Sequence, residues 1–230
     1  MTRITVINPN TSDELTATIT KAAQVAAGAG VRVTGVHPAV GVPSVESHAE
    51  EAIAAVGVIE QVRAHQAETD AFVIACFGDT GVAAAREVAT CPVVGMTEAA
   101  LQTACLVAHR FVVITLPART IAHSDRVVRA LGLEHRCTVT AVDVAVAELV
   151  DGSTHLLDAF AEAARAADRA EAVVLGCAGL ADLVDPLSDR LGVPVIDGVA
   201  AGIGIAAGLV AMGLNTSRAS TFGPVELEFP

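Results

Sequence analysis

Two cysteines occupy the same local setting in distant parts of the chain, and two such thiols could act together as a base and an acid. Cys76 and Cys177 each close an apolar run, and each is followed two residues later by a glycine and then by a stretch of helical composition. A thiolate can remove the proton from a carbon atom next to a carbonyl group, and a thiol on the opposite face can return one. Because inversion in both directions requires these roles to exchange, the pair predicts proton transfer at carbon with inversion.

The same spacing returns downstream of the two cysteines, which indicates an internal repeat. The cysteines lie 101 residues apart, and Pro92 and Pro194, each followed by a short apolar run, lie 102 residues apart. We interpret the repeat as a duplicated half-domain that forms two lobes packed face to face. Such a duplication would place one thiol on each side of a central cleft.

Short apolar runs alternate with longer alanine-rich stretches, and this alternation predicts parallel sheets covered by helices. The expected strands lie at residues 3–8, 31–36, 71–76, 93–95, 111–115, 138–143, 172–176 and 194–196. The expected helices lie at residues 12–27, 46–66, 80–89, 97–108, 119–131, 153–168, 180–191 and 198–212. We therefore predict an α/β fold of two lobes, each a mostly parallel sheet flanked by helices, with the active site in the cleft between them. The expected first lobe is residues 1–97 plus 208–230, and the second is residues 98–207.

Both cysteines fall at the carboxyl ends of expected strands, where such sheets bind their ligands. A thiol between a strand end and a helix start lies against unpaired backbone N–H groups, which favour the thiolate. We therefore expect the pKa values of Cys76 and Cys177 to lie near neutrality. Asp79 would oppose this if it faced the sulfur, and we expect it to cap its own helix instead. The remaining cysteines lack this setting and are interpreted as structural, namely Cys91, Cys105 and Cys137.

Other polar groups follow strand ends and could hold a substrate. The backbone amides of Gly78 and Gly179 could donate to a developing enolate oxygen. Asn8 and Asn10 follow the first expected strand, and their amides could hold a polar ring or a carboxylate. Thr115 ends another strand and could donate a hydroxyl.

The charge balance and the apolar pattern exclude several classes of partner. A net charge of −12 and a pI near 4.9 argue against nucleic acid, which binds a basic surface. No apolar run reaches the roughly 20 residues of a membrane span, and no secretory leader is expected before the strand at residues 4–7. Five cysteines without a C-x-x-C pair fit a reduced compartment. We expect a cytoplasmic protein that acts on a small molecule and binds neither nucleic acid nor a membrane.

The residue types that common cofactors need are scarce. Lys21 is the only lysine, and its surroundings are typical of a solvated helix face, which disfavours a Schiff-base cofactor such as pyridoxal phosphate. The chain has no tyrosine, so cysteine, histidine, aspartate and glutamate are the candidate acid–base groups. The seven histidines show no metal-ligand spacing, and we expect neither a metal nor an organic cofactor.

Four segments resemble the aspartate/glutamate racemase superfamily, and within it the hydantoin and allantoin racemases. These segments are residues 6–12, 74–79, 174–179 and 193–197. The resemblance implies two lobes related by pseudo-twofold symmetry, no cofactor, a homo-oligomer, and Cys76 and Cys177 as the pair acting at C5 of a hydantoin ring. It also implies a pocket lined by further residues, namely Asn8, Asn10, Phe77, Gly78, Asp79, Thr115, Ala178 and Gly179.

Two other functions stay open from the residues alone. A maleate-isomerase-like enzyme would add one cysteine to the alkene of a small dicarboxylate, but cations near the expected loops are sparse, with Arg86 and Arg119 the nearest. A non-catalytic protein could bind a small molecule between two lobes that contain buried cysteines. The ring substituent also stays open between aromatic, aliphatic and ureido groups, because Ser47 and His48 stand where several members of the resembled family carry bulkier or aromatic residues.

Overall fold

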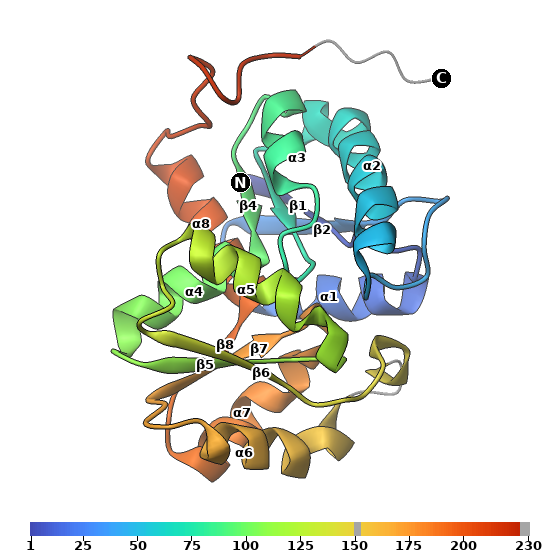
Figure 1. The fold of residues 1–230 in the computed structure, drawn as a ribbon. Coiled ribbons are helices and arrows are strands. Elements are labelled where there is room, and N and C mark those ends of the chain that lie inside the picture. The colour runs from blue at the N-terminus through green and yellow to red at the C-terminus, as the bar shows by residue number, and fades with distance from the viewer. Residues whose placement is uncertain (150–152, 226–230) are drawn as a thin grey trace.

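Two parallel sheets form the framework of the protein (Figure 1). The structure, a computed structural model, describes residues 1–149 and 153–225. The first sheet has the strand order β2-β1-β3-β4, with bounds Val31–Val36, Thr2–Ile7, Ala71–Ile74 and Val93–Gly95. The second has the order β6-β5-β7-β8, with bounds Cys137–Ala141, Phe111–Thr115, Ala172–Gly176 and Val195–Asp197. The predicted α/β fold of two lobes is confirmed, and the matching strand orders agree with a duplicated half-domain.

The central strands are buried on both faces, and their sequences explain why. Every residue of β3 and of β7 is buried, and both strands are continuous apolar runs, as expected where helices cover both faces of a parallel sheet. β1 pairs with β3 so that Ile7 aligns with Ile74, and β5 pairs with β7 so that Thr115 aligns with Gly176. In each sheet the carboxyl ends of the central strands therefore meet at one edge.

Helices flank the two sheets. They are α1 (Asp13–Ala26), α2 (His48–His65), α3 (Val82–Val88), α4 (Met96–Val107), α5 (Ile121–Ala130), α6 (Leu157–Ala166), α7 (Val184–Leu191) and α8 (Gly198–Ala211). Short 3-10 segments lie at Gln66–Glu68, Ala118–Thr120, Val146–Leu149, Thr154–Leu156 and Ala178–Leu183. Ser12 and Ser47 cap α1 and α2, because their side chains accept hydrogen bonds from backbone N–H groups of the first turn. In the part of the chain that the structure describes, no helix is both long and apolar enough to cross a membrane.

Among the α-helices that begin later than the sequence pattern predicts, two follow a cysteine. The helix predicted at residues 80–89 begins only at Val82, because Asp79 and Gly81 have positive φ values of 56° and 74°. That left-handed conformation cannot continue a right-handed helix. The helix predicted at residues 180–191 starts as a 3-10 segment and becomes α-helical only at Val184. The turns after the two cysteines are therefore more irregular than expected.

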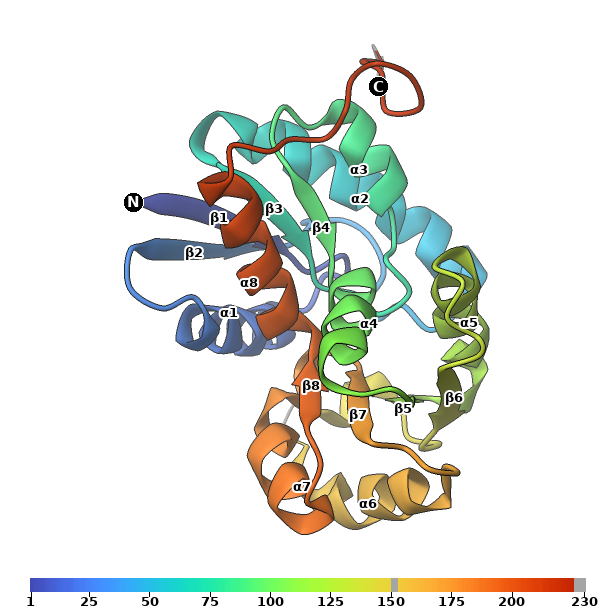
Figure 2. The same cartoon turned by 90° about the vertical axis from the view of Figure 1, so that its left-hand side faces the viewer.

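Helices α4 and α8 hold the two sheets together. α4 follows β4 but packs against β7 and β8 of the second sheet, and α8 follows β8 but packs against β1, β3 and β4 of the first. The two helices lie side by side between the sheets (Figure 2). A Cβ atom at Gly202 would lie only 2.8 Å from Val73 Cγ1, so α8 needs glycine there. One apolar core continues from Ile4 and Val73 across these helices to Phe111 and Val174.

The lobe boundaries stay a prediction. Strands β1 to β4 fall within residues 1–97 and strands β5 to β8 within residues 98–207, while α8 runs across the expected boundary after residue 207. The last part of the expected first lobe, residues 226–230, lies outside the described residues.

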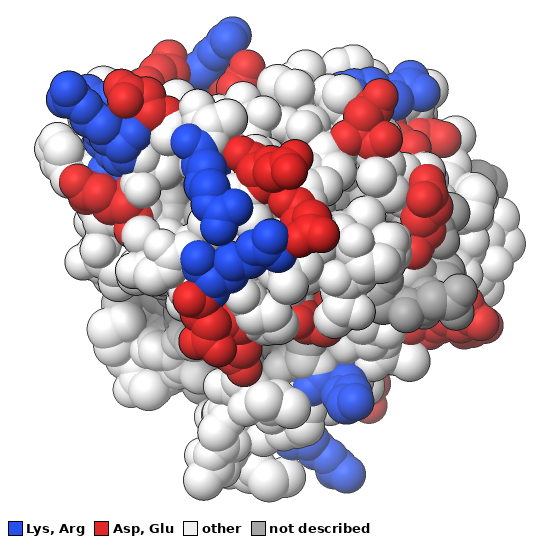
Figure 3. All heavy atoms as spheres, turned by 90° about the horizontal axis from the view of Figure 1, so that it is seen from below, with Lys and Arg blue, Asp and Glu red and all other residues white. Residues whose placement is uncertain are grey.

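The surface over α6 and α7 carries acidic and basic side chains next to one another (Figure 3). One ion pair, between Arg190 and Asp158, joins these two helices. As far as its described residues show, this face has no continuous basic stripe of the kind that a nucleic-acid backbone requires.

Candidate active site

A cleft opens between the carboxyl ends of the two sheets. Its empty volume is about 440 Å³, part of it open to solvent. The chain around the first sheet contributes Asn8, Asn10, Leu15, Val45, Ala75, Cys76 and Phe77 to its lining. The chain around the second sheet contributes Thr115, Leu116, Thr120, Val146, Gly176, Cys177 and Ala178. The two thiols thus reach one cleft from opposite sheets.

The loop after β3 holds Cys76 through the side chain of Thr80. Thr80 Oγ1 donates a hydrogen bond to Cys76 Sγ over 3.4 Å. Gly78 and Asp79 have positive φ values of 106° and 56°, so the chain turns sharply and brings residue 80 back to the thiol. The sequence interpretation missed Thr80, although a hydroxyl shortly after a cysteine at a strand end was a signal that could have found it.

The two glycine amides predicted to donate to an enolate oxygen are engaged elsewhere. Gly78 N donates to Thr97 Oγ1 over 2.7 Å, so this amide does not point into the cleft as expected. The backbone N–H groups of Gly179 and Ala178 are directed at Cys177 instead. These N–H groups act to lower the pKa of the Cys177 thiol, although the Cys177 side chain makes no capping hydrogen bond to the first turn that follows it.

Asp79 caps a different helix from the one expected. Its carboxylate oxygens accept hydrogen bonds from Thr97 N over 2.8 Å and Glu98 N over 2.9 Å, at the start of α4, whereas the sequence pattern predicted a cap on the helix that follows Asp79. The positive φ of Asp79 makes this possible, and so does Gly95, where a Cβ atom would lie 2.4 Å from Asp79 Cγ. Burial raises the pKa of Asp79 to about 6, and the charge of Glu98 adds to the effect.

Burial raises the pKa of both thiols, which corrects the expectation of values near neutrality. The pKa of Cys76 rises to about 12, because burial outweighs the hydrogen bond from Thr80 and the charge of Cys177 raises it further. The pKa of Cys177 rises to about 11, because burial outweighs the hydrogen bonds from the Gly179 and Ala178 backbone. Enclosure between the two lobes therefore destabilises a thiolate more than the adjacent donors stabilise it.

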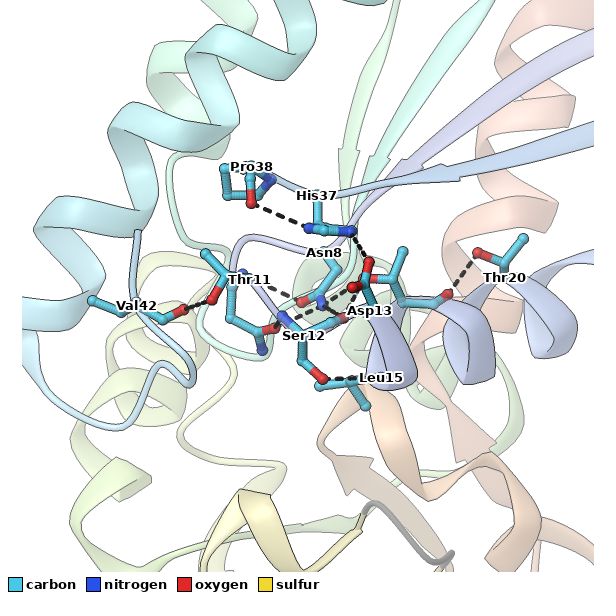
Figure 4. A network of polar contacts seen from close by, with 11 residues as sticks. Asn8, Thr11, Ser12, Asp13, Leu15, Thr20, His37, Pro38 and Val42 are labelled. Carbon is cyan, nitrogen blue, oxygen red and sulfur yellow. Dashed lines mark hydrogen bonds and ion pairs between the residues drawn. The ribbon is translucent and has the colours of Figure 1, made fainter. Parts of the chain in front are cut away.

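Asn8 belongs to a buried hydrogen-bond network after β1 (Figure 4). Asn8 Nδ2 donates to Asn10 Oδ1 over 2.8 Å and to Thr16 Oγ1 over 2.9 Å. Ser12 N donates to Asn10 Oδ1 over 2.9 Å, which fixes the orientation of that amide. Among the described residues Asn10 Nδ2 donates to no partner, so it is the amide group that a ligand in the cleft can use.

Thr115 and Thr120 form a second polar element of the cleft. Their hydroxyl oxygens lie 2.8 Å apart, and Thr115 Oγ1 also lies within donating distance, 3.2 Å, of the Gly176 carbonyl. A Cβ atom at Gly176 would lie 2.7 Å from Thr115 Cα, so glycine is required where the ends of β5 and β7 meet. Thr120 was missed by the sequence interpretation, because no local pattern distinguishes it.

The structure brings most of the predicted pocket residues together. The lining includes Cys76, Cys177, Asn8, Asn10, Phe77, Thr115 and Ala178. Three predicted residues do not line the cleft, namely Gly78, Asp79 and Gly179. They shape the turns behind the thiols, through the contacts with Thr97, α4 and Cys177 described above.

Comparison with known proteins decides the family. Residues 4–206 match the family described as Asp/Glu/Hydantoin racemase. The chain belongs to this family. A hydantoin racemase from Rhizobium meliloti is 40% identical over 224 residues, which cover 95% of this chain and 93% of the relative. A hydantoin racemase from Pseudomonas sp. (strain NS671) is 39% identical over 225 residues, which cover 96% of this chain and 90% of the relative.

A solved structure also supports membership of this family. Allantoin racemase from Klebsiella pneumoniae superposes with a TM-score of 0.94 at 43% sequence identity, covering 99% of this chain and 95% of that one. The protein is thus an isomerase of the racemase type, and its resemblance to the superfamily is confirmed. In this racemase the cleft has thiols on opposite walls, an arrangement suited to proton transfer at both faces of one carbon atom.

Proposed function

We propose that this racemase inverts C5 of 5-substituted hydantoins or of allantoin, with Cys76 and Cys177 as the two proton-transfer groups and without a cofactor. The observation that carries the proposal is the position of the thiols: Cys76 follows β3, Cys177 follows β7, and both line one cleft. The two groups are close enough for the charge of Cys177 to raise the pKa of Cys76. A planar ring between them would offer one face to each sulfur.

In the proposed reaction one cysteine starts as a thiolate and the other as a thiol. The thiolate removes the C5 proton, and the electron pair of the C–H bond moves into the ring to form an enolate. The opposite thiol then gives its proton to C5 from the other face. The first sulfur ends protonated and the second ends as a thiolate. These protonation states are the ones that the reverse reaction needs. Like-charge repulsion disfavours two thiolates at the same time, and each proton-transfer group should contribute about 10²–10⁴-fold to the rate.

The polar groups of the cleft suit a neutral ring. Asn10 Nδ2 is placed to donate to a ring carbonyl or to the enolate oxygen. The hydroxyl oxygens of Thr115 and Thr120 can accept from a ring N–H, because their hydrogens have backbone carbonyls as partners. The described residues of the lining include no lysine or arginine, whereas a small dicarboxylate would call for such cations. The relatives named hydantoin racemase and allantoin racemase support the same substrate class.

Three further expectations concern the cofactor, the location in the cell and the oligomeric state. Both proton-transfer groups are side chains of the protein, so the proposed chemistry has no step that calls for a cofactor. A cytoplasmic location and a homo-oligomer stay predictions from the sequence and the family resemblance.

Incubation of single enantiomers in D2O tests the substrate proposal. A 5-alkyl hydantoin, a 5-arylmethyl hydantoin and allantoin would each be followed by optical rotation and by the C5–H signal in NMR. Protein-free samples are the control, because hydantoins racemise unaided. We expect both signals to disappear faster than in the control for at least one ring. Unchanged rotation and an unchanged C5–H signal for all three rings would remove the assignment and favour dicarboxylates or binding alone.

A further inference from the structure

Outside the cleft, three side chains that can ligate a metal ion converge between α2 and α5. His48 and Glu51 lie one turn apart at the start of α2, and His123 lies in the first turn of α5. The potential ligand atoms of these three residues all lie within 4.8 Å of one another. The rings of His48 and His123 have centroids 4.6 Å apart and are tilted by 52°. The fold thus assembles a set that the spacing of the histidines in the sequence did not reveal.

His123 is the buried member of this set, and its ring has no hydrogen-bond partner. The residue is only 3% exposed, and within residues 1–149 and 153–225 neither ring nitrogen takes part in a hydrogen bond. Its ring nitrogens are not among the fully buried side-chain atoms that lack a partner, so they lie where a cation from solvent can reach them.

Glu51 brings a negative oxygen to the same place. Arg126 donates to both carboxylate oxygens, and His48 Nδ1 lies 3.5 Å from Oε2. A metal ion would have to share this carboxylate with Arg126, taking one oxygen and leaving the other to the guanidinium.

We propose that His48, Glu51 and His123 form a site for one divalent transition-metal ion, with Zn²⁺ the common ion that matches the set best. Two imidazoles, one carboxylate and one water are a ligand set that Zn²⁺ takes with bonds of roughly 2.0–2.2 Å. A tetrahedral site with such bonds has ligand atoms roughly 3.3 Å apart, so the three side chains must close slightly. His48 can make this movement because its side chain is 71% exposed, whereas packing fixes His123.

The ion would join two elements directly behind the loop that carries Cys76. A Cβ atom at Gly78 would lie 3.0 Å from His123 Cβ, so His123 packs against this loop. Arg126, which shares Glu51 with the site, also donates to the Gly78 carbonyl over 3.0 Å. An ion that draws Glu51 away from Arg126 therefore acts on the turn that positions the thiol. We expect binding to change the rate of racemisation, a consequence that rests on the proposed role of Cys76, whereas binding itself does not.

Titration of metal-free protein with Zn²⁺ tests the site, with calorimetry giving stoichiometry and affinity. Because thiolates also bind Zn²⁺, the same titration is made on a Cys76→Ser/Cys177→Ser variant. We expect one ion per chain in both proteins, and an affinity at least about tenfold weaker in His48→Ala and in His123→Ala. Zn²⁺ should raise the unfolding temperature of the parent protein, because it binds the folded state, and should do so less in either variant.

His65→Ala is the matched control. His65 and Glu68 form a similar histidine–glutamate pair near the end of α2, but no described third ligand completes a group there. The His65→Ala variant should bind Zn²⁺ with the affinity of the parent protein. Circular dichroism of each variant shows whether it is folded. Equal affinity in the parent, His48→Ala and His123→Ala would overturn the site, as would binding that vanishes when the two cysteines are replaced. Neither result depends on whether the protein racemises a hydantoin.

Discussion

At the scale of single residues, position and not acidity separates Cys76 and Cys177 from the other cysteines. Burial also raises the pKa of Cys91 to about 11 and that of Cys137 to about 12. Cys76 and Cys177 differ because they follow the central strands of opposite sheets and face one cleft. At neutral pH only a small fraction of either thiol is ionised, so the thiolate is the scarce species in the proposed reaction.

The raised pKa values predict a racemisation rate that climbs with pH. The base is a thiolate, and burial holds the pKa of both cysteines above the ordinary value, so each pH unit below the lower pKa increases the thiolate fraction about tenfold. We expect kcat/KM for a 5-substituted hydantoin to keep rising from neutral into alkaline pH, after the unaided rate is subtracted. A profile that is already flat at neutral pH would show that the thiols ionise there.

Replacement of Thr80 tests the hydrogen bond at Cys76. Thr80→Val keeps the side-chain shape but removes the donor, so it should raise the pKa of Cys76 further. At neutral pH kcat/KM should fall about 2–10-fold, the equivalent of one hydrogen bond. Thr80→Ser keeps the donor and should retain the parent pH profile. Coinciding profiles for the Val and Ser variants would mean that the hydroxyl does not stabilise the thiolate.

At the scale of elements, glycine residues allow α8 to pack closely against the first sheet. A Cβ atom at Gly202 would meet Val73 of β3 at 2.8 Å, whereas nothing lies within 4 Å of one at Gly204, two residues further along the same helix. The strand before Cys76 therefore rests against a helix that follows the other sheet. Helix α8 thus packs against strands of both sheets, whose carboxyl ends form the walls of the cleft.

These two glycines make a matched pair of substitutions. Gly202→Ala should lower the free energy of unfolding by about 1–3 kcal/mol, because the added methyl group overpacks a buried contact. Gly204→Ala should raise it by about 0.5–1 kcal/mol, because alanine favours the helix and meets no neighbour. Urea titration followed by circular dichroism measures both changes. If both variants were stabilised alike, the close approach of α8 and β3 would be wrong.

Elements were predictable where the local pattern decides them. The strands at residues 93–95, 111–115 and 172–176 have the predicted bounds, because these buried apolar runs carry the signature of a sheet covered on both faces. The strand at residues 31–36 also has the predicted bounds, although none of its residues is fully buried. The start of α3 and the cap made by Asp79 were not predictable. They depend on a left-handed backbone at residue 79 and on the approach of α4, which tertiary packing sets.

At the scale of the whole molecule, contacts between the lobes shape the cleft. Glu46 Oε1 accepts a hydrogen bond from Val146 N over 3.2 Å, and Val146 lines the cleft. This bond joins two loops that lie 100 residues apart in the chain. It is placed to hold the rim of the cleft around a bound ring.

Removal of the Glu46 side chain should therefore weaken substrate binding more than the chemical step. We expect Glu46→Ala to raise KM about 3–10-fold, the equivalent of one hydrogen bond, with a much smaller change in kcat. Glu60→Ala, an exposed position on α2, is the control and should leave both constants unchanged. A lower kcat at unchanged KM would show that the contact positions the thiols instead.

The two-lobed architecture was readable from the duplicated cysteine setting, but the residues that cross between lobes were not. Thr120, Glu46 and the cluster of His48, Glu51 and His123 are brought together by packing between distant segments. A single sequence gives no signal for such pairs. The raised pKa of the thiols has the same origin, because the burial that causes it arises only when the lobes close over each other.

Exchange of C5–H in D2O by Cys76→Ala and Cys177→Ala tests the two-thiol mechanism most directly. Each variant keeps one thiol, which can reach only the enantiomer whose C5–H points toward it. We predict that neither variant racemises, that each exchanges one enantiomer without inversion, and that the two variants select opposite enantiomers. Cys91→Ala is the control and should racemise both. Racemisation by either single variant, or exchange of the same enantiomer by both, would contradict the assignment of Cys76 and Cys177 to opposite faces of the ring.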